Sequence, residues 1–232
     1  MHQRFFSIVV PAHNEEKLIR ETLSHLAVLQ YSKDRYEVIV VENGSTDKTF
    51  EIAKRFESPN CRVMACEKGV SRARNFGVTL CSSAMDWCLY LDADTLLEPS
   101  FLEELNVYLD EHKGVVWGTA TIRPNEDTRA SRFWYWYTNV TDKMLKVMQR
   151  VHIVRADLAR SEQYDETLSV GEDLHYGRAL GKRGTYFFMP THSVISSTRR
   201  FKKKGYIRMF FINMRAGLPK WLLKHLDWEV VR

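Results

Sequence analysis

The stretch Trp87-Cys88-Leu89-Tyr90-Leu91-Asp92-Ala93-Asp94 decides the fold, because it places two acidic side chains at the end of an apolar run. The run over 87–91 predicts a buried strand. Open α/β folds bind ligands outside the carboxyl ends of their parallel strands, so Asp92 and Asp94 are expected at a ligand-binding edge. Two carboxylates one residue apart suit Mg2+ or Mn2+, which completes its shell with water and substrate phosphates. An isolated Asp-x-Asp can also simply cap the next helix, so the rest of the chain decides between the two interpretations.

Length and composition bound the architecture. The 232 residues suffice for one sizeable core, and 44% hydrophobic with 27% charged residues is a globular composition. No stretch is apolar for the roughly 18 residues that a membrane span needs, and the N-terminus leads into a strand pattern without the features of a signal peptide. The four cysteines form no Cys-x-x-Cys pair, which favours reduced thiols over disulfides or a zinc site. We therefore expect a cytoplasmic protein.

Short apolar runs alternate with helical patterns, which predicts an α/β fold with a mostly parallel central sheet flanked by helices. The expected strands are 5–10, 37–41, 62–65, 86–91, 115–120, 151–154 and 185–189. The expected helices are about 15–29, 46–56, 71–81, one after Pro99, an aromatic helix from 133 to about 149, about 172–180, and a helical region after Lys202. We expect a single domain over 1–232. Its nucleotide-binding half extends to about residue 120, and its second half, about 121–232, supplies the catalytic base and the C-terminal helices.

Four further polar segments leave expected strands or open expected helices. They are Val10-Pro11-Ala12-His13-Asn14-Glu15-Glu16, Val41-Glu42-Asn43-Gly44-Ser45-Thr46-Asp47, the segment 68–77 with Arg72 and Arg74, and Gly171-Glu172-Asp173. Turns and helix caps alone would explain the first two segments. Two arginines near the start of a helix suit a diphosphate, and Asp173 could serve as a general base toward a hydroxyl group.

As an ordered set, these segments and Leu91-Asp92-Ala93-Asp94 resemble the family 2 glycosyltransferases. The resemblance is strong over about residues 5–120, good around 171–178 and vague after about residue 205. It implies a GT-A fold and an inverting transfer of sugar from a nucleotide-diphosphate sugar to an acceptor hydroxyl, assisted by Mg2+ or Mn2+. A UDP-sugar or GDP-sugar would be the donor. Cell-envelope polysaccharide, glycolipid or a related glycan would be the class of product.

The resemblance also implies roles for individual residues. The residues implied to bind the donor are Pro11, Ala12, Asn14, Glu15, Glu42, Asn43, Ser45, Arg74, Asn75, Asp92, Ala93, Arg199 and Arg200. Asp173 matches the catalytic base of the family and Asp94 its metal ligand, while His192 matches a late metal contact of some relatives. Glu42 stands where an aspartate is usual, which leaves the donor base open.

Two other functions would use a similar pocket. A sugar nucleotidyltransferase of related architecture would carry a glycine-rich basic loop after the first strand, where this chain has Pro11-Ala12-His13-Asn14. A catalytically silent nucleotide-sugar-binding protein would not need the complete set of Asp92, Asp94 and Asp173. Both observations favour a glycosyltransferase.

The net charge of +5 is concentrated in Arg199-Arg200-Phe201-Lys202-Lys203-Lys204. Such a cluster can simply form a solvated face. It also suits a diphosphate or an acidic membrane surface, where each basic residue contributes about 1 kcal/mol. No nucleic-acid-binding motif accompanies it, so no nucleic acid partner is expected. The segment 221–228 would suit an amphipathic helix on the inner face of a membrane, in agreement with a lipid-linked acceptor. Packing of this segment on the domain, or in a dimer, stays equally open.

Overall fold

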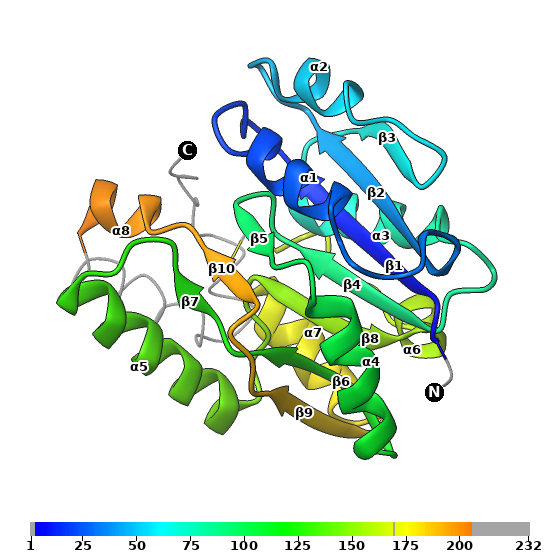
Figure 1. Cartoon of the computed structure of the whole chain (residues 1–232), viewed down its shortest axis with the longest axis vertical. Helices are drawn as coiled ribbons and strands as arrows, with labels where there is room; N and C mark the ends of the chain where they lie inside the picture. Colours follow the sequence, from blue (N-terminus) through cyan, green and yellow to red (C-terminus); the bar gives the residue numbers. More distant parts are fainter. Residues whose placement is uncertain (1–2, 169, 206–232) are drawn as a thin grey trace.

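A seven-stranded sheet in the order β3-β2-β1-β4-β8-β6-β9 organises the molecule (Figure 1). The structure is a computed structural model that describes residues 3–168 and 170–205. The strands of this sheet are β1 (Phe6–Ala12), β2 (Tyr36–Asn43), β3 (Cys61–Cys66), β4 (Trp87–Leu91), β6 (Val115–Ala120), β8 (Val151–Arg155) and β9 (Thr185–Met189). A second sheet, in the order β5-β10-β7, consists of β5 (Thr95–Leu97), β7 (Arg123–Pro124) and β10 (Val194–Ser196).

The pairing of the strands brings several loops to one edge of the large sheet. Strand β1 pairs in parallel with both β2 and β4, and β2 pairs in parallel with β3. Strand β8 is antiparallel to both of its neighbours, β4 and β6, and β6 is parallel to β9. The prediction of a mostly parallel sheet is therefore confirmed, and the carboxyl ends of β1, β2 and β4 lie side by side.

The helices cover both faces of the large sheet (Figure 1). They are α1 (Ile19–Ala27), α2 (Thr49–Lys54), α3 (Val70–Thr79), α4 (Phe101–Glu111), α5 (Arg129–Leu145), α6 (Ala156–Ser161), α7 (Glu172–Leu180) and α8 (Arg199–Lys204), with a 3-10 turn over Lys33–Arg35. None of the helices in the described part of the chain has the length and apolar composition needed to cross a membrane.

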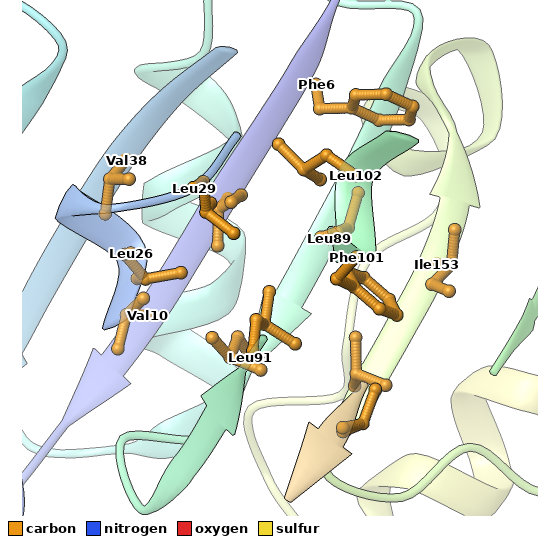
Figure 2. Packing of buried hydrophobic residues seen from close by; sticks show 14 of the residues in the cluster. Phe6, Val10, Leu26, Leu29, Val38, Leu89, Leu91, Phe101, Leu102 and Ile153 are labelled. Carbon is orange, nitrogen blue, oxygen red and sulfur yellow. The ribbon is translucent and has the colours of Figure 1, made fainter. Parts of the chain in front are cut away.

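Two hydrophobic clusters form because successive side chains of a strand point to opposite faces of the sheet. Phe6 and Val10 of β1 belong to the cluster beneath α1 and α4, where Phe101 and Leu102 also pack (Figure 2). Val9 belongs to the cluster on the other face, which includes residues of α3, α6 and α7. The sheet is thus buried on both sides, as a parallel sheet requires.

The structure differs from the sequence-based expectation mainly in short elements and helix starts. Helix α1 begins at Ile19 rather than at about 15, because Asn14 adopts a left-handed backbone with φ of 53°. Helix α5 begins at Arg129, where the Thr128 side chain forms a reciprocal capping box with Ser131. The strands β5, β7 and β10 and the helix α6 were not predicted. Apart from α8, the expected terminal helical region, including 221–228, lies outside the described residues.

Gly118 of β6 is a position where a side chain would collide with the backbone. A Cβ atom there would lie 2.1 Å from the carbonyl oxygen of Phe187, in the neighbouring strand β9. We expect Gly118→Ala to lower the free energy of unfolding by about 3 kcal/mol, because overpacking shifts the backbone of the sheet. Urea unfolding measures the change. Gly177→Ala in α7 is the matched control, since its Cβ would meet no atom closer than 3.4 Å. An equal loss in both variants would contradict the prediction.

Candidate active site

The loops after β1 and β2 are joined into one rim by hydrogen bonds. The imidazole of His13 donates from Nδ1 to the carbonyl of Asn43 at 2.8 Å. The backbone amide of Asn14 donates to Ser45 Oγ at 2.9 Å, and the Asn14 side-chain oxygen accepts from the Thr46 amide at 2.7 Å. Asn14 therefore ties the two loops together and does not cap α1, whose N-terminus has no side-chain cap.

The other residues expected to bind the nucleoside lie on the same rim. Pro11 and Ala12 end β1, and Ala12 pairs in register with Glu42 near the end of β2. The carboxylate of Glu42 accepts a hydrogen bond from the Ser45 amide, so its longer side chain closes the turn after β2. The structure thus brings together Pro11, Ala12, Asn14, Glu42, Asn43 and Ser45, as the sequence led us to expect of a binding loop.

Asp92 is held at the end of β4 by two arginines from distant segments. Its carboxylate lies 3.3 Å from Arg74 Nη2 and 3.4 Å from Arg150 Nη1. Its backbone amide donates to the Arg150 carbonyl at 2.9 Å. The carbonyl of the next residue, Ala93, accepts a hydrogen bond from the buried hydroxyl of Thr22 in α1 at 2.8 Å. These contacts fix the backbone that carries the acidic pair.

Asp94 presents a buried carboxylate oxygen without a hydrogen bond. Its side chain is 3% exposed, and Oδ1 has no hydrogen-bond partner among the described residues. The described residues form no group of three or more His, Cys, Asp or Glu side chains that would enclose a metal. An unsatisfied buried carboxylate oxygen is costly, and a cation bound to it would remove that cost. Asp94 therefore fits a cation that takes one protein ligand and fills its shell from a ligand.

Arg199 of α8 reaches the same place from the C-terminal end of the described chain. Its Nη2 atom lies 2.9 Å from both carboxylate oxygens of Glu15 and 3.8 Å from Asp94 Oδ2. Arg199 thus connects the rim after β1 with the acidic pair after β4. Arg200 also belongs to α8, but its side chain lies outside the described residues.

Arg74 of α3 lies at the centre of a buried cluster of carboxylates. Its side chain is 4% exposed, and its Nη1 lies 2.7 Å from Asp173 Oδ1 and 3.3 Å from Glu172 Oε1. Its Nη2 faces Asp92, and its guanidinium stacks on the Tyr164 ring at 4.9 Å. The sequence assigned Arg74 to the donor. The structure shows its charge directed at three protein carboxylates from two other segments of the chain.

Asp173 opens α7 after Gly171, whose φ of 73° is favourable for glycine. Its side chain is 29% exposed, so the carboxylate is accessible beside the Arg74 cluster. On the protein side, His152 Nε2 lies 3.6 Å from Asp173 Oδ1, beyond hydrogen-bond range, and His152 Nδ1 shares a hydrogen bond of 2.5 Å with the Tyr164 hydroxyl. Burial lowers the pKa of His152 to about 4, so this imidazole is neutral at physiological pH.

Glu172 differs from its neighbour Asp173 in environment. Burial, and then the adjacent charge of Asp173, raise the pKa of Glu172 to about 8, although the nearby Arg74 acts in the opposite direction. A carboxyl group with so high a pKa holds its proton through much of the neutral range. Of this acidic pair, Asp173 is consequently the better candidate for accepting a proton.

Asn75, which the sequence analysis assigned to the donor, makes hydrogen bonds to the segment 164–166. The side chain of Asn75 donates to the Tyr164 carbonyl and to Glu166, both at 3.0 Å, and accepts from the Tyr164 amide. Its amide group therefore anchors the segment before α7.

His192 is not brought to Asp94, which corrects the prediction of a shared metal site. In the antiparallel pair of β5 and β10, Ser196 lies opposite Thr95 and Val194 opposite Leu97. Residue 192 therefore lies beyond the far end of β5, where its carbonyl accepts from Arg123 at 2.7 Å. The family resemblance implied the assignment, and the unpredicted pairing of β5 with β10 separates the two residues.

Three residues of the cluster were missed by the sequence analysis: Arg150, His152 and Tyr164. His152 is a polar residue inside the apolar run 151–154, which was a usable signal for a buried polar contact. Arg150 and Tyr164 lie in loops without a motif, and only the antiparallel insertion of β8 beside β4 brings this segment to the acidic residues.

An open cavity of about 450 Å³ lies beside Arg199. Its lining includes Lys17 and Leu18 before α1, Asn125 before α5, and Ser197, Arg199 and Lys202 around α8. The volume is within the range of small-molecule sites. Space for a ligand therefore adjoins the arginine that reaches Asp94.

The sequence of this chain is similar to a known protein family and to several of its members. The family model "Glycosyl transferase family 2" matches residues 7–159, which contain β1, β2, β4 and the acidic pair. Poly(ribitol-phosphate) beta-N-acetylglucosaminyltransferase TarS of Staphylococcus aureus is 33% identical over 111 residues, which are 46% of this chain and 19% of TarS. Glycosyltransferase AglE of Haloferax volcanii is 29% identical over 206 residues, which are 82% of this chain and 66% of AglE. The chain thus spans about a fifth of TarS and about two thirds of AglE.

Solved structures share the fold at low sequence identity. S. aureus TarS 1-349 in complex with UDP-GlcNAc matches with a TM-score of 0.68 at 20% identity, covering 83% of this chain and 58% of that chain. The mannosyltransferase PcManGT from Pyrobaculum calidifontis, in complex with GDP-Man and Mn2+, matches with a TM-score of 0.65 at 19% identity. It covers 97% of this chain and 68% of PcManGT. These matches confirm the expected GT-A fold.

Proposed function

This chain belongs to glycosyl transferase family 2, and we propose that it transfers a sugar from a nucleoside-diphosphate sugar to an acceptor hydroxyl, with inversion at the anomeric carbon. One observation carries the proposal: Asp92 and Asp173 share the guanidinium of Arg74, and the buried Asp94 follows Asp92 by two residues. This arrangement offers a metal-binding carboxylate and a separate, accessible base at one edge of the sheet.

The donor is proposed to bind against the rim formed by the loops after β1 and β2. Asn14, Asn43 and Ser45 place polar groups on this rim, where we propose that a base and a ribose bind. The nucleotide sugars in the two neighbouring structures, UDP-GlcNAc and GDP-Man, support a UDP-sugar or GDP-sugar as the donor class.

A divalent ion, Mg2+ or Mn2+, is proposed to bind at Asp94. The orphaned Oδ1 atom fits a hard cation that keeps few protein ligands and shares the phosphates of its substrate. When bound, such an ion neutralises charge on the departing nucleoside diphosphate. Arg199, 3.8 Å from Asp94, would add a fixed positive charge beside the same group. The Mn2+ in the PcManGT structure supports this proposal.

Asp173 is proposed to accept the proton of the attacking hydroxyl. Inversion requires one displacement and one base, and the accessible Asp173 meets that need. Arg74 donates to Oδ1 and fixes the carboxylate, while the neutral His152 adds no competing charge on the buried side. Arg74 thereby couples the position of the base to Asp92, at the start of the metal-binding loop.

We also propose a cytoplasmic location at the inner face of a membrane, with a lipid-linked acceptor. Free thiols at Cys61, Cys66, Cys81 and Cys88 support a reducing compartment. The basic run that includes α8 supports contact with an anionic surface. The product would then belong to cell-envelope or glycolipid synthesis.

Nucleotide-dependent thermal stability tests the donor and metal proposals together. Ligand at about 100 times its dissociation constant adds roughly 2.7 kcal/mol, which for this chain length raises the melting temperature by about 5–10 °C. We expect such a shift with UDP or GDP and their sugars, and a smaller one when Mn2+ or Mg2+ is withheld. Release of labelled sugar to water or acceptor then tests transfer itself.

Asp94→Asn is the matched control for the metal. This variant should lose the metal-dependent part of the shift and keep the metal-independent part, because the rim is unchanged. CDP and dTDP serve as comparison nucleotides. The absence of any shift with all four nucleotides, with or without metal, would count against the proposed donor site.

A further inference from the structure

Helix α5 lies at the outer edge of the molecule (Figure 1), and several of its large apolar side chains are exposed. Phe133 is 56% exposed, Trp136 60% and Met144 75%. Side chains of this size are rarely exposed together on one helix without a partner. With Val140, which is half-buried, we call these residues the outer stripe of α5.

Helical geometry makes the outer stripe continuous. Residues 133, 136, 140 and 144 follow the spacing i, i+3, i+7 and i+11, which keeps them on one side of a helix with 3.6 residues per turn. The buried residues of α5 are Ser131, Tyr135 and Asp142, and they occupy the opposite side. One side of α5 therefore packs on the domain, and the opposite side presents an apolar stripe to the outside.

The exposed charges beside the stripe are basic. Arg132 and Lys143 are exposed on one flank, Arg129 is exposed one turn before Phe133 in line with the stripe, and Lys146 is exposed just past the end of α5. The acidic residue within α5, Asp142, is buried, and the exposed Asp127 before the helix pairs with Arg132 at 3.3 Å. An apolar stripe with aromatic residues and a basic border is the pattern of helices that lie in the interface of an anionic membrane.

We propose that the outer stripe of α5 inserts into the headgroup region of an anionic lipid bilayer. Phe133 and Trp136 would enter the apolar boundary, and the flanking arginines and lysines would contact lipid phosphates. The inference names the contact surface for the proposed membrane location, on which it rests. Vesicle binding is measured without nucleotide, so it can fail independently of the proposed transfer reaction.

Charge favours lipid over the two other occupants that could cover the stripe. The segment 206–232 contains five basic residues (Arg208, Arg215, Lys220, Lys224 and Arg232) and two acidic ones (Asp227 and Glu229), so it has the same sign of charge as the border of α5. A second copy of α5 would likewise place basic flanks together, which is unfavourable at a protein interface. An anionic bilayer is complementary to both features.

The same helix is in contact with the proposed active site. Tyr135 of α5 packs against Phe201 of α8 with ring centroids 5.9 Å apart, and Trp134 stacks on Phe201 at 6.4 Å. Two residues before Phe201, Arg199 contacts Glu15 and faces Asp94. A bilayer at the outer stripe would thus lie one helix away from the cavity beside Arg199, where an acceptor held in lipid could enter.

Flotation of the full chain with vesicles tests the proposal. The vesicles contain phosphatidylcholine alone or with about 30% phosphatidylglycerol. We expect binding to the anionic vesicles that weakens with added salt, and at least tenfold weaker binding to neutral vesicles. The double substitution F133Q/W136Q should weaken anionic binding at least tenfold, whereas V28Q, at another exposed apolar position, should retain it.

Two double charge reversals distinguish a specific role of the basic residues beside the stripe from general electrostatic attraction. R129E/K143E should lose anionic binding, and R55E/K182E, at exposed positions elsewhere, should lose less than threefold. Melting temperatures and nucleotide-induced shifts should be equal in all variants, which establishes folding. Absence of vesicle binding by the parental chain, or equal binding by F133Q/W136Q, overturns the proposal. A dimer that F133Q/W136Q converts to monomer, or vesicle binding gained only after removal of 206–232, overturns it in favour of those occupants.

Discussion

Asp173→Asn is expected to lower the rate of sugar transfer by about 10²- to 10⁴-fold while nucleotide binding is retained. The asparagine has nearly the same size, so the chain around α7 need not move, but its amide cannot accept the proton of the acceptor. Donor binding should persist, because the rim after β1 and β2 and the Asp94 carboxylate are unchanged. The rate is measured as labelled sugar transferred, and binding as the nucleotide-induced thermal shift of the same preparation.

Glu172→Gln is the matched control at the neighbouring carboxyl group. Both residues open α7 and contact Arg74, but Glu172 is 13% exposed and its pKa is raised to about 8. Because Glu172 is largely protonated at neutral pH, replacing it with a neutral amide of equal size should cost far less activity. The reverse result, an active Asp173→Asn and an inactive Glu172→Gln, would transfer the role of base to Glu172.

The sequence was informative wherever a strand ends in a polar motif. The apolar run before Asp92 predicted β4, and the rule for carboxyl ends of parallel strands predicted that Asp92 and Asp94 lie at this edge of the sheet. The same reasoning located the loops around Asn14 and Asn43, which the structure joins by hydrogen bonds. These features depend on local patterns and on parallel order, which a sequence carries.

Other contacts depend on long-range pairings of strands and side chains that no local sequence pattern predicts. Strands β5, β7 and β10 have three residues or fewer, too short for an alternating pattern, and their register is what separates His192 from Asp94. Arg74 contacts Asp92, which is 18 positions later in the chain, and Asp173, which is 99 positions later. Near a helix start, an arginine suggests a phosphate site, and only the folded structure reveals that carboxylates already surround this one.

Arg74→Met is expected to lower the free energy of unfolding by about 3–5 kcal/mol at pH 8.5, because it leaves buried carboxylates without their common partner. Asp92 keeps Arg150, but Glu172 and Asp173 lose the guanidinium that both of them contact. Urea unfolding measures the loss. Arg72→Met, two residues earlier on the same helix, removes an exposed arginine paired with Glu67 and Glu166 and should change stability little.

The pH dependence of this loss identifies its cause. The pKa of Glu172 is already raised from 4.5 to about 8 in the folded chain, and Arg74 is among the groups that lower it. Without Arg74 the folded-state pKa rises further, so the folded state holds a proton that the unfolded chain releases above its own lower pKa. Stability then falls in both proteins as pH rises above 4.5, and above about pH 8 it keeps falling in Arg74→Met, where the parent has already released the proton. The difference between variant and parent should therefore be smaller at pH 6 than at pH 8.5.

A purely steric role for Arg74 would give the same loss at both pH values, and that outcome would contradict the electrostatic account. Arg74→Lys distinguishes charge from geometry if Arg74→Met proves too unstable to purify. Lysine keeps the charge, but as a point donor it cannot hold Asp92 on one side and Asp173 on the other as the planar guanidinium does. We expect this variant to recover part of the stability but little of the transfer rate. Position of the base relative to the metal-binding loop, rather than net charge, would then be what Arg74 contributes to the reaction.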